Sequence, residues 1–311
     1  MTTLSLAKYH GLGNDFLVLL DIEGTSPISA DLARRVCARH RGIGADGLIR
    51  VTRPPLWGDG DDALPDEAVL VFELRNADGS PAEMSGNGMR CLAHGALDAG
   101  LVTAASPFVV ATSAGPRRVT VRPLSGVTDG VGPAREVWAS VEMGRPVVSG
   151  EGERCNVGHG QLRVDMGNPH LVVLGRDPGT IAVEALGPDL ERAVPERQNV
   201  EFVALGPGAD EITMRVWERG VGETLACGTG ACAAAVAMHH WGRVGRRVTV
   251  HQPGGDALVE MGGDGAVSLS GPSVRVARCQ VEVRSAARAA GAELESADDA
   301  EHCREEAVGA P

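Results

Sequence analysis

The chain has 311 residues, of which 43% are hydrophobic and 23% are charged, and its formal net charge is −12. This balance is typical of a folded globular protein of about two domains and excludes a disordered or fibrous chain. No apolar run approaches the length of about 18 residues that a membrane span needs, and no clustered basic surface supports nucleic-acid binding. We therefore expect neither a membrane nor a nucleic acid as a partner.

The cysteines and the single lysine limit the cofactor chemistry. The seven cysteines are widely spaced and odd in number, which argues against a disulfide framework, and no pair has zinc-ribbon spacing. Lys8 is the only lysine, so a pyridoxal-phosphate Schiff base would depend on a residue whose neighbours do not fit such a site. The first ten residues lack the basic and apolar regions of a secretory signal. The sequence thus predicts a cytoplasmic protein and offers neither a zinc-ribbon metal site nor a pyridoxal-phosphate site.

Short apolar segments separated by turns predict a strand-rich chain. Residues 4–20 are typical of two strands around a glycine-rich turn, residues 29–40 of a helix capped by Ser29, and residues 53–67 of a surface loop. Further strands are expected at residues 68–74, 108–111, 118–121, 137–143, 161–166, 171–174, 200–204, 211–217, 248–251, 257–261 and 274–283. Short strands joined by turns favour an antiparallel sheet.

Two alanine-rich helices are expected at residues 86–99 and 228–241, and the motifs before them repeat each other. Ser85 and Cys227 each precede a Gly-x-Gly sequence, 142 residues apart (227 − 85). The sequences around Asn14 and Asn168 also match, 154 residues apart (168 − 14). Two similar offsets in the same order predict an internally duplicated fold. We expect the boundary near residues 124–133 and a disordered acidic tail over residues 285–311.

These motifs point to carbanion chemistry. The start of a helix offers free N–H groups and the positive end of the helix dipole, and both stabilise negative charge. We expect this position to lower the pKa of the Cys227 thiol from about 8.5 towards neutrality. The N–H groups that follow each cap can receive a carboxylate. Two such caps on opposite sides of one carbon would allow proton removal from one face and return to the other.

The chain resembles the diaminopimelate epimerase family from residue 8 to about residue 235. The motifs that carry the resemblance follow the family order: 10–16 (HGLGNDF), 42–47 (GIGADG), 76–80 (NADGS), 82–88 (AEMSGNG), 90–93 (RCLA), 166–170 (MGNPH), 199–202 (NVEF), 218–224 (ERGVGET) and 226–230 (ACGTG). The resemblance implies an α/β (α+β) fold of two pseudo-symmetric lobes, each a mainly antiparallel sheet wrapped around a central helix. Residues 1–130 would form the first lobe, completed by a strand at about 274–284, and residues 131–273 the second.

The resemblance also implies an activity and its residues. It implies a cofactor-independent isomerase that interconverts LL- and meso-2,6-diaminopimelate, in lysine and cell-wall precursor biosynthesis, with a small amino acid as ligand and a homodimer as the candidate assembly. The catalytic positions are Cys227 and Ser85, with His170 and Glu218 tuning the thiols. The implied substrate-binding residues are Asn14, Asn76, Gly86, Asn87, Asn168, Asn199, Glu218, Arg219, Gly228 and Thr229. Diaminopimelate carries two carboxylates and two ammoniums, which suits amides and a Glu–Arg pair.

Ser85 departs from the family, which has cysteine at this position. A serine hydroxyl does not titrate near neutrality and is activated only by an adjacent base. Three interpretations stay open: an epimerase in which Ser85 is a neutral donor or proton relay, an epimerase or racemase of another amino acid, and a non-catalytic amino-acid-binding homologue. With Ser85, no disulfide can join the two catalytic positions. Cys91 and Cys232 lie inside their helices and are expected in the core.

Overall fold

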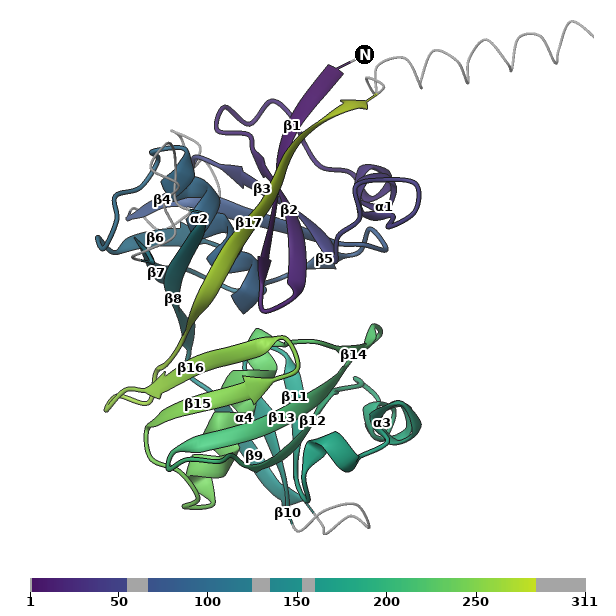
Figure 1. The fold of residues 1–311 in the computed structure, drawn as a ribbon, viewed down its shortest axis with the longest axis vertical. Helices are drawn as coiled ribbons and strands as arrows, with labels where there is room; N and C mark the ends of the chain where they lie inside the picture. Colours follow the sequence, from purple (N-terminus) through teal and green to yellow (C-terminus); the bar gives the residue numbers. More distant parts are fainter. Residues whose placement is uncertain (1, 55–66, 125–134, 153–159, 284–311) are drawn as a thin grey trace, which may run out of the picture.

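The structure, a computed structural model, describes residues 2–54, 67–124, 135–152 and 160–283. These residues form two lobes joined by β8 (Glu136–Gly144) and β17 (Val267–Val283) (Figure 1). Most of the expected surface loop and of the expected boundary, and all of the expected acidic tail, lie outside the described residues. No helix in the described part of the chain has the length and apolar character to span a membrane.

The first lobe contains seven strands and two helices of the described chain. They are β1 (Thr2–Gly11), β2 (Asn14–Leu20), α1 (Ala30–Cys37), β3 (Gly47–Thr52), β4 (Ala68–Asn76), β5 (Pro81–Ala82), α2 (Gly86–Asp98), β6 (Phe108–Ala111) and β7 (Arg117–Pro123). The second lobe contains β9 (Val147–Gly152), β10 (Gly160–Asp165), β11 (Pro169–Leu174), η1 (Pro178–Thr180), α3 (Val183–Glu191), β12 (Asn199–Leu205), β13 (Glu211–Glu218), β14 (Gly222–Thr224), α4 (Gly228–His240), β15 (Arg247–Gln252) and β16 (Gly255–Met261).

The two lobes repeat the same connections. In the first lobe, β2 pairs in parallel with β3 after α1, and β4 with β6 after α2. In the second, β11 pairs in parallel with β12 after α3, and β13 with β15 after α4. Parallel neighbours need a crossover, which these helices supply, whereas the hairpins are antiparallel as expected. The sheet is therefore mixed, and the repeated motifs correspond to a repeated fold.

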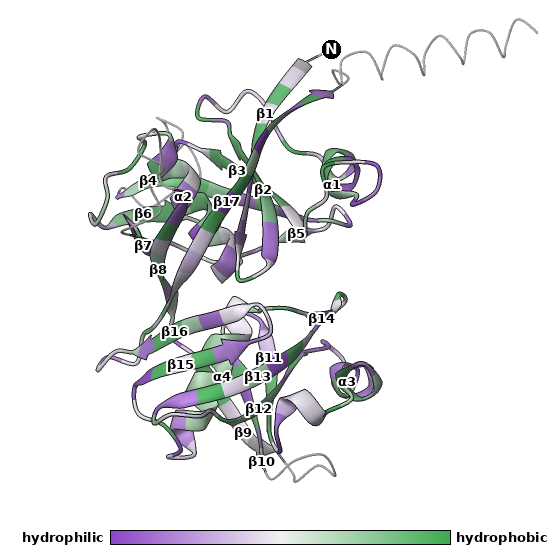
Figure 2. Cartoon of the chain, viewed as in Figure 1, coloured by the Kyte–Doolittle hydropathy of each residue, from purple (hydrophilic) through white to green (hydrophobic). Residues whose placement is uncertain are grey.

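In each lobe the strands wrap around one buried helix. α2 and α4 contribute fully buried side chains to the main core, among them Met89, Leu92, Ala233 and Met238. Alanine predominates in α4, so that strands can approach the helix closely on all sides. The shorter helices α1 and α3 cover the outer faces, each over its own small apolar cluster. Hydrophilic residues occur on the outer side of these two helices (Figure 2).

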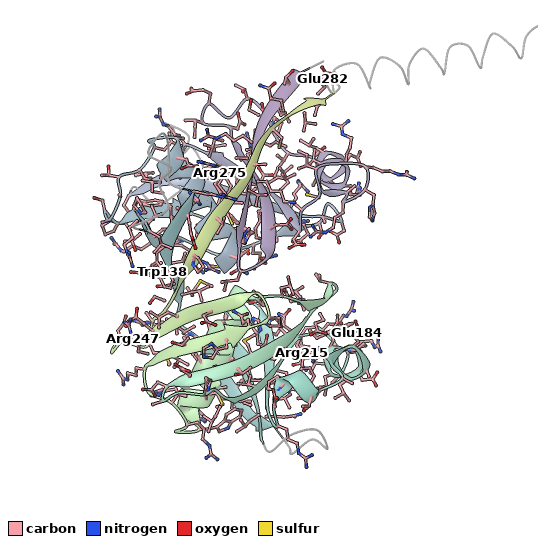
Figure 3. The ribbon with its side chains drawn as sticks, in the orientation of Figure 1. Trp138, Glu184, Arg215, Arg247, Arg275 and Glu282 are labelled. Carbon is pink, nitrogen blue, oxygen red and sulfur yellow. The ribbon has the colours of Figure 1, made fainter. Side chains whose placement is uncertain are left out.

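β8 and β17 belong to both lobes. The first part of β17 pairs with β16 and β8, and from Val274 to Val283 it pairs with β1, so that the C-terminal strand lies against the N-terminal one. Trp138 on β8 pairs with Pro272 on β17 at the junction (Figure 3). β17 is longer than the strand expected at residues 274–283 because it begins in the second lobe.

The helices predicted from the sequence are those with local signals such as a capping residue, and elements without such signals were not predicted. Ser29 caps α1 as predicted, its Oγ accepting a hydrogen bond from the N–H of Leu32 at 3.1 Å. The expected helices at 86–99 and 228–241 agree with α2 and α4 to within one residue. α3 was not expected, because it contains Gly187 and Pro188 and lacks a side-chain cap. β3, β5, β9 and β14 were also not expected.

Candidate active site

Ser85 and Cys227 occupy the same position in the two lobes. Each is the N-cap of a helix of 13 residues, with an extended backbone at φ −141° and ψ 123° for Ser85 and φ −122° and ψ 123° for Cys227. Ser85 Oγ accepts a hydrogen bond from the N–H of Gly88 at 3.0 Å, and Cys227 Sγ accepts one from the N–H of Gly230 at 3.4 Å. The repeated motif therefore builds the same cap twice.

The two helices meet at their N-termini. A Cβ added to Gly228 would lie 3.2 Å from the Cα of Gly86 and 3.3 Å from the backbone N of Asn87, so the glycines permit this close approach. Asn87 also bridges the junction, since its Nδ2 donates to the carbonyl of Ala226 at 3.2 Å. Both helix ends carry free N–H groups and a positive dipole end. Their meeting point therefore favours an anion.

Cys227 lies beside this junction, 6% exposed and close to two carboxyl groups. Burial, followed by the negative charges of Glu218 and Glu201, raises the pKa of Cys227 well above its ordinary value. Hydrogen bonds from Thr229 and from the N–H of Gly230 lower that pKa by less. The expected pKa near neutrality is therefore wrong for this structure: the helix N-terminus acts on the thiol, but desolvation and the carboxylates outweigh it. The thiol keeps its proton.

Glu218 ends β13 next to Cys227. Burial raises the pKa of Glu218, and hydrogen bonds with Thr224 and Cys227 only partly offset this rise. A carboxylate with a raised pKa is a better proton acceptor than an ordinary one. Glu218 is therefore suited to exchange a proton with the thiol.

His170 links the carboxyl group of Glu201, through hydrogen bonds, to the start of helix α4. Its side chain is fully buried together with that of Glu201, and its Nδ1 lies 2.7 Å from Glu201 Oε1. His170 Nε2 lies 3.0 Å from Asn168 Oδ1, and Asn168 Nδ2 donates to Thr229 Oγ1 at 3.5 Å. Thr229 Oγ1 is in turn 3.5 Å from Cys227 Sγ. These residues form one hydrogen-bonded series that ends at the thiol.

The surroundings of Ser85 differ in chemistry. Glu218 stands nine residues before Cys227, and the residue nine positions before Ser85 is Asn76. Asn76 ends β4 as Glu218 ends β13, and its Nδ2 donates to Ser80 Oγ at 3.1 Å. A neutral amide does not take up a proton near pH 7. At this position the first lobe has an amide where the second has a carboxyl group, so the two caps are not equivalent.

A pocket of about 390 Å³ lies between the lobes. Its wall includes four of the predicted site residues, namely Asn76, Asn168, Arg219 and Thr229. Met84, which precedes Ser85, also lines it, and Thr229 stands two residues after Cys227, so each helix cap is within two residues of the wall along the chain. A larger cavity of about 680 Å³ lies at Tyr9, Asp98 and Arg278, and none of the predicted site residues is among those that line it.

Other predicted residues hold their neighbours rather than line the pocket. Asn14 Nδ2 donates to Asp46 Oδ2 at 2.8 Å, and its Oδ1 accepts from Asn87 Nδ2 at 3.1 Å. Asn199 Oδ1 accepts from the backbone N–H of Arg219 at 2.9 Å. These asparagines thus position a helix terminus and a pocket residue. Outside the pocket lining lie Ser85, Gly86, Asn87, Gly228, Cys227, Glu218, His170, Asn14 and Asn199.

Sequence reasoning missed three polar residues of this region. Glu201 contacts His170, Asp46 holds Asn14, and Gln252 Oε1 accepts from the N–H of Cys227 at 2.9 Å. Glu201 stands inside an apolar run that predicts a buried strand, and a charged residue there was an available signal. The expectation for the other helix cysteines is confirmed, since Cys91 and Cys232 are fully buried in the core.

Comparison with known proteins identifies the family. A sequence model described as diaminopimelate epimerase matches residues 6–137 and 162–276. The diaminopimelate epimerase of Desulfitobacterium hafniense is 40% identical over 294 residues, covering 88% of this chain and 96% of that protein. That of Desulforudis audaxviator is 43% identical over 286 residues, covering 88% of this chain and 97% of that protein.

Solved structures share the fold at low sequence identity. A Bacillus anthracis phenazine biosynthesis protein of the PhzF family matches with a TM-score of 0.65 and 14% identity, covering 91% of this chain and 100% of that chain. A hydroxyproline epimerase from Agrobacterium vitis matches with a TM-score of 0.63 and 18% identity, covering 91% of this chain and 94% of that chain. The fold is thus the two-lobed α/β fold of these solved structures, and the chain belongs to the diaminopimelate epimerase family.

Proposed function

We propose that this protein is a diaminopimelate epimerase, an isomerase that interconverts LL- and meso-2,6-diaminopimelate by removing and returning the proton at one α-carbon. Its place is in the biosynthesis of lysine and cell-wall precursors. The observation that carries the proposal is the meeting of two capped helix N-termini beside a pocket, with a thiol at one cap and a hydroxyl at the other. Relatives named for this activity align with 88% of the chain.

The reacting carboxylate fits the junction of the two helices. The N–H groups at the starts of α2 and α4, which include those of Gly86, Asn87, Gly228 and Thr229, would receive it. The α-carbon would then lie between the two caps, and the side chain of the substrate would extend into the pocket. Arg219, in the pocket wall, suits the distal carboxylate. Glu218, half-buried beside Cys227 and with a raised pKa, suits proton transfer better than distal binding.

The proton path starts with the protonated thiol. Cys227 must lose its proton before it can act as a base, and the neighbouring Glu218 carboxylate is the acceptor. The α-ammonium of the substrate brings positive charge near the acids and so favours the thiolate. The thiolate then takes the α-proton, and the helix N-termini stabilise the negative charge that develops. Ser85 returns a proton to the opposite face from its hydroxyl and regains one from solvent, and Glu218 releases to solvent the proton that it took from the thiol.

The remaining properties follow from this chemistry. A reaction that needs a free thiol fits a reducing compartment, and Cys37, Cys91, Cys227, Cys232 and Cys279 are free cysteines of the described chain. We therefore propose a cytoplasmic enzyme without a cofactor. A homodimer is the proposed assembly, and light scattering of the purified protein tests it.

Exchange of the α-proton in D₂O, followed by NMR, tests the function. The protein is incubated with LL- and then with meso-diaminopimelate, without added pyridoxal phosphate. With the wild type, we expect the α-proton signal to disappear while the other isomer forms. Cys227→Ser should show neither proton exchange nor formation of the other isomer. Ser85→Ala should retain exchange but lose inversion. If the wild type gives no exchange and Ser85→Cys restores it, the pocket fits diaminopimelate but Ser85 does not support the reaction. No exchange in either protein would refute the proposal and favour another amino acid or a binding role.

A further inference from the structure

Glu201 is a buried carboxyl group with no role in the reaction described above. It lies on β12 with 0% exposure, and its Oε1 is 2.7 Å from Nδ1 of the equally buried His170. Burying a carboxyl group is costly even when it is paired, and an apolar residue of similar size often packs as well. The presence of Glu201 at this depth therefore calls for an explanation beyond packing.

The contacts of Glu201 show that it is held mainly by His170. Its second oxygen, Oε2, is buried and has no hydrogen-bond partner among the described residues. Its first oxygen lies against the first turn of α4, because a Cβ added to Gly230 would be 2.6 Å from Glu201 Oε1 and 3.3 Å from Cys227 Sγ. Glycine at position 230 thus leaves room for the carboxyl group beside the thiol. Glu201 belongs to the reaction side of the lobe rather than to its outer shell.

The hydrogen bonds of His170 give Glu201 a specific task. His170 Nε2 faces Asn168 Oδ1 at 3.0 Å, so this nitrogen carries a hydrogen and donates it. The other ring nitrogen, Nδ1, shares a proton with Glu201 or accepts one from it. With both nitrogens engaged, the ring is fixed in one orientation. Asn168 is then held with its oxygen towards the ring and its NH₂ group towards Thr229 and the pocket.

We propose that Glu201 is a positioning residue: it fixes the ring of His170 and thereby fixes Asn168 as a hydrogen-bond donor at the pocket wall. The proposal rests on the proposed function, because a donor at this wall serves a substrate that carries carboxylates. Glu201 does not touch the substrate. It acts through two intervening side chains, and removing it should loosen substrate binding more than it slows turnover.

Steady-state kinetics of five variants tests this chain of contacts. Glu201→Met keeps the volume but removes the partner of Nδ1, and we expect KM to rise roughly tenfold. Glu201→Gln can donate its amide N–H to Nδ1, so it should stay within about threefold of the wild type. In an Asn168→Ala background, Glu201→Met should change KM less than about twofold, because the residue through which it acts is gone. Equal effects of Glu201→Met in both backgrounds, or equal losses in Met and Gln variants, would overturn the proposal.

Glu211→Met is the matched control. Glu211 also pairs with a histidine, His251 Nε2 at 3.1 Å, but at the opposite end of β13 from Glu218, about 23 Å along the strand. Its KM should equal that of the wild type. A rise in KM that matches that of Glu201→Met would mean that loss of any Glu–His pair loosens this lobe, and would refute the positioning role.

A readout without substrate separates this proposal from the proposed function. In ¹⁵N-histidine-labelled protein, the ring of His170 should show one fixed state with a hydrogen on Nε2 that exchanges slowly. Glu201→Met should give mixed tautomers or fast exchange, and Glu201→Gln should keep the wild-type pattern. An unchanged ring signal in Glu201→Met would refute the positioning role even if the enzyme is active. If the wild type fails to turn over diaminopimelate but the ring signals change as expected, the function fails and the positioning role stands.

Discussion

Arg90 provides a prediction whose size follows from the structure. It lies on α2 with 0% exposure, and its guanidinium donates to Asn87 Oδ1 and, at 3.1 Å, to the carbonyl of Pro272. Within the described chain, Arg90 forms no ion pair with a carboxylate by the usual distance criterion of about 4 Å, and its Nε has no hydrogen-bond partner. Burial lowers the pKa of Arg90 to about 10. The folded protein therefore holds a cation that is poorly solvated and uncompensated by a neighbouring acid.

We predict that Arg90→Met costs little stability but much activity. The pKa shift from 12.5 to about 10 corresponds to a burial penalty of about 3 kcal/mol, which is present at every pH below 10 because the group stays charged there. The two hydrogen bonds of the charged group are worth about 1.5–3 kcal/mol each. Arg90→Met removes both the burial penalty and the two hydrogen bonds, so the free energy of unfolding should fall by between zero and about 3 kcal/mol. Meanwhile Asn87 loses the donor that orients it at the start of α2.

Urea unfolding and steady-state kinetics check the two halves of this prediction. The free energy of unfolding should fall by no more than about 3 kcal/mol, while kcat/KM should fall at least tenfold. Arg247→Met serves as the control, because Arg247 is exposed and pairs with Glu260 at the surface of the second lobe (Figure 3). This control should change neither quantity appreciably. A loss of more than about 5 kcal/mol in Arg90→Met, or unchanged kcat/KM, would refute the reasoning.

Three further predictions concern single side chains. Glu218→Gln removes a carboxylate that raises the pKa of Cys227, so alkylation of Cys227 by iodoacetamide at pH 7.5 without substrate should become faster, while turnover should fall because the acceptor of the thiol proton is gone; a slower alkylation would mean that Glu218 does not raise the pKa of the thiol. Gly230→Ala puts a Cβ within 2.6 Å of Glu201 Oε1, and kcat/KM should fall at least tenfold, whereas a fully active variant would show that Glu201 moves freely. Desolvation lowers the pKa of His251, but hydrogen bonds to two carboxylates raise this pKa by more, so the net shift is upward. The charged pair therefore stabilises the fold fully below pH 6.5 and less as pH rises through the folded pKa. His251→Gln should lose less than about 1 kcal/mol at pH 6 and nothing at pH 9, and the opposite trend in urea unfolding would contradict the assignment.

The elements that the sequence predicted best are those with local signals. Ser29, Ser85 and Cys227 sit at helix starts with the expected cap geometry, because a cap depends on a few adjacent residues. The parallel pairings were not predicted, because a short apolar run does not reveal which strand lies beside it. α3 was not predicted because Gly187 and Pro188 are weak helix formers. Tertiary contacts stabilise it: its apolar face packs on the sheet, and Glu191 accepts hydrogen bonds from Trp217 Nε1 and from the N–H of Gly220.

For the site as well, features with local sequence signals could be predicted, and features that depend on tertiary packing could not. The helix N-terminus at Cys227 is visible in the sequence, but the thiol is buried in the folded lobe, and Glu218 and Glu201 approach it from two other strands. Burial, followed by these two charges, reverses the expected pKa shift. The family motifs located the residues around the pocket without indicating which of them line it. Asn14 and Asn199 turn out to hold neighbours, a distinction that depends on side-chain directions fixed only by tertiary packing. Their assigned roles towards substrate stay predictions.

The pairing of β17 with β1 sets the order in which the protein can be completed during synthesis. Thr2 faces Val283 across this ladder, so β1 leaves the ribosome long before the strand that pairs with it. Until then β2 is the one neighbour of β1 among the described strands, and the other edge of β1 is unpaired. Pairing of such distant segments is slow and leaves the nascent first lobe open to aggregation. Truncation before residue 274 should therefore unfold the N-terminal lobe, even though it removes none of that lobe's own first 123 residues.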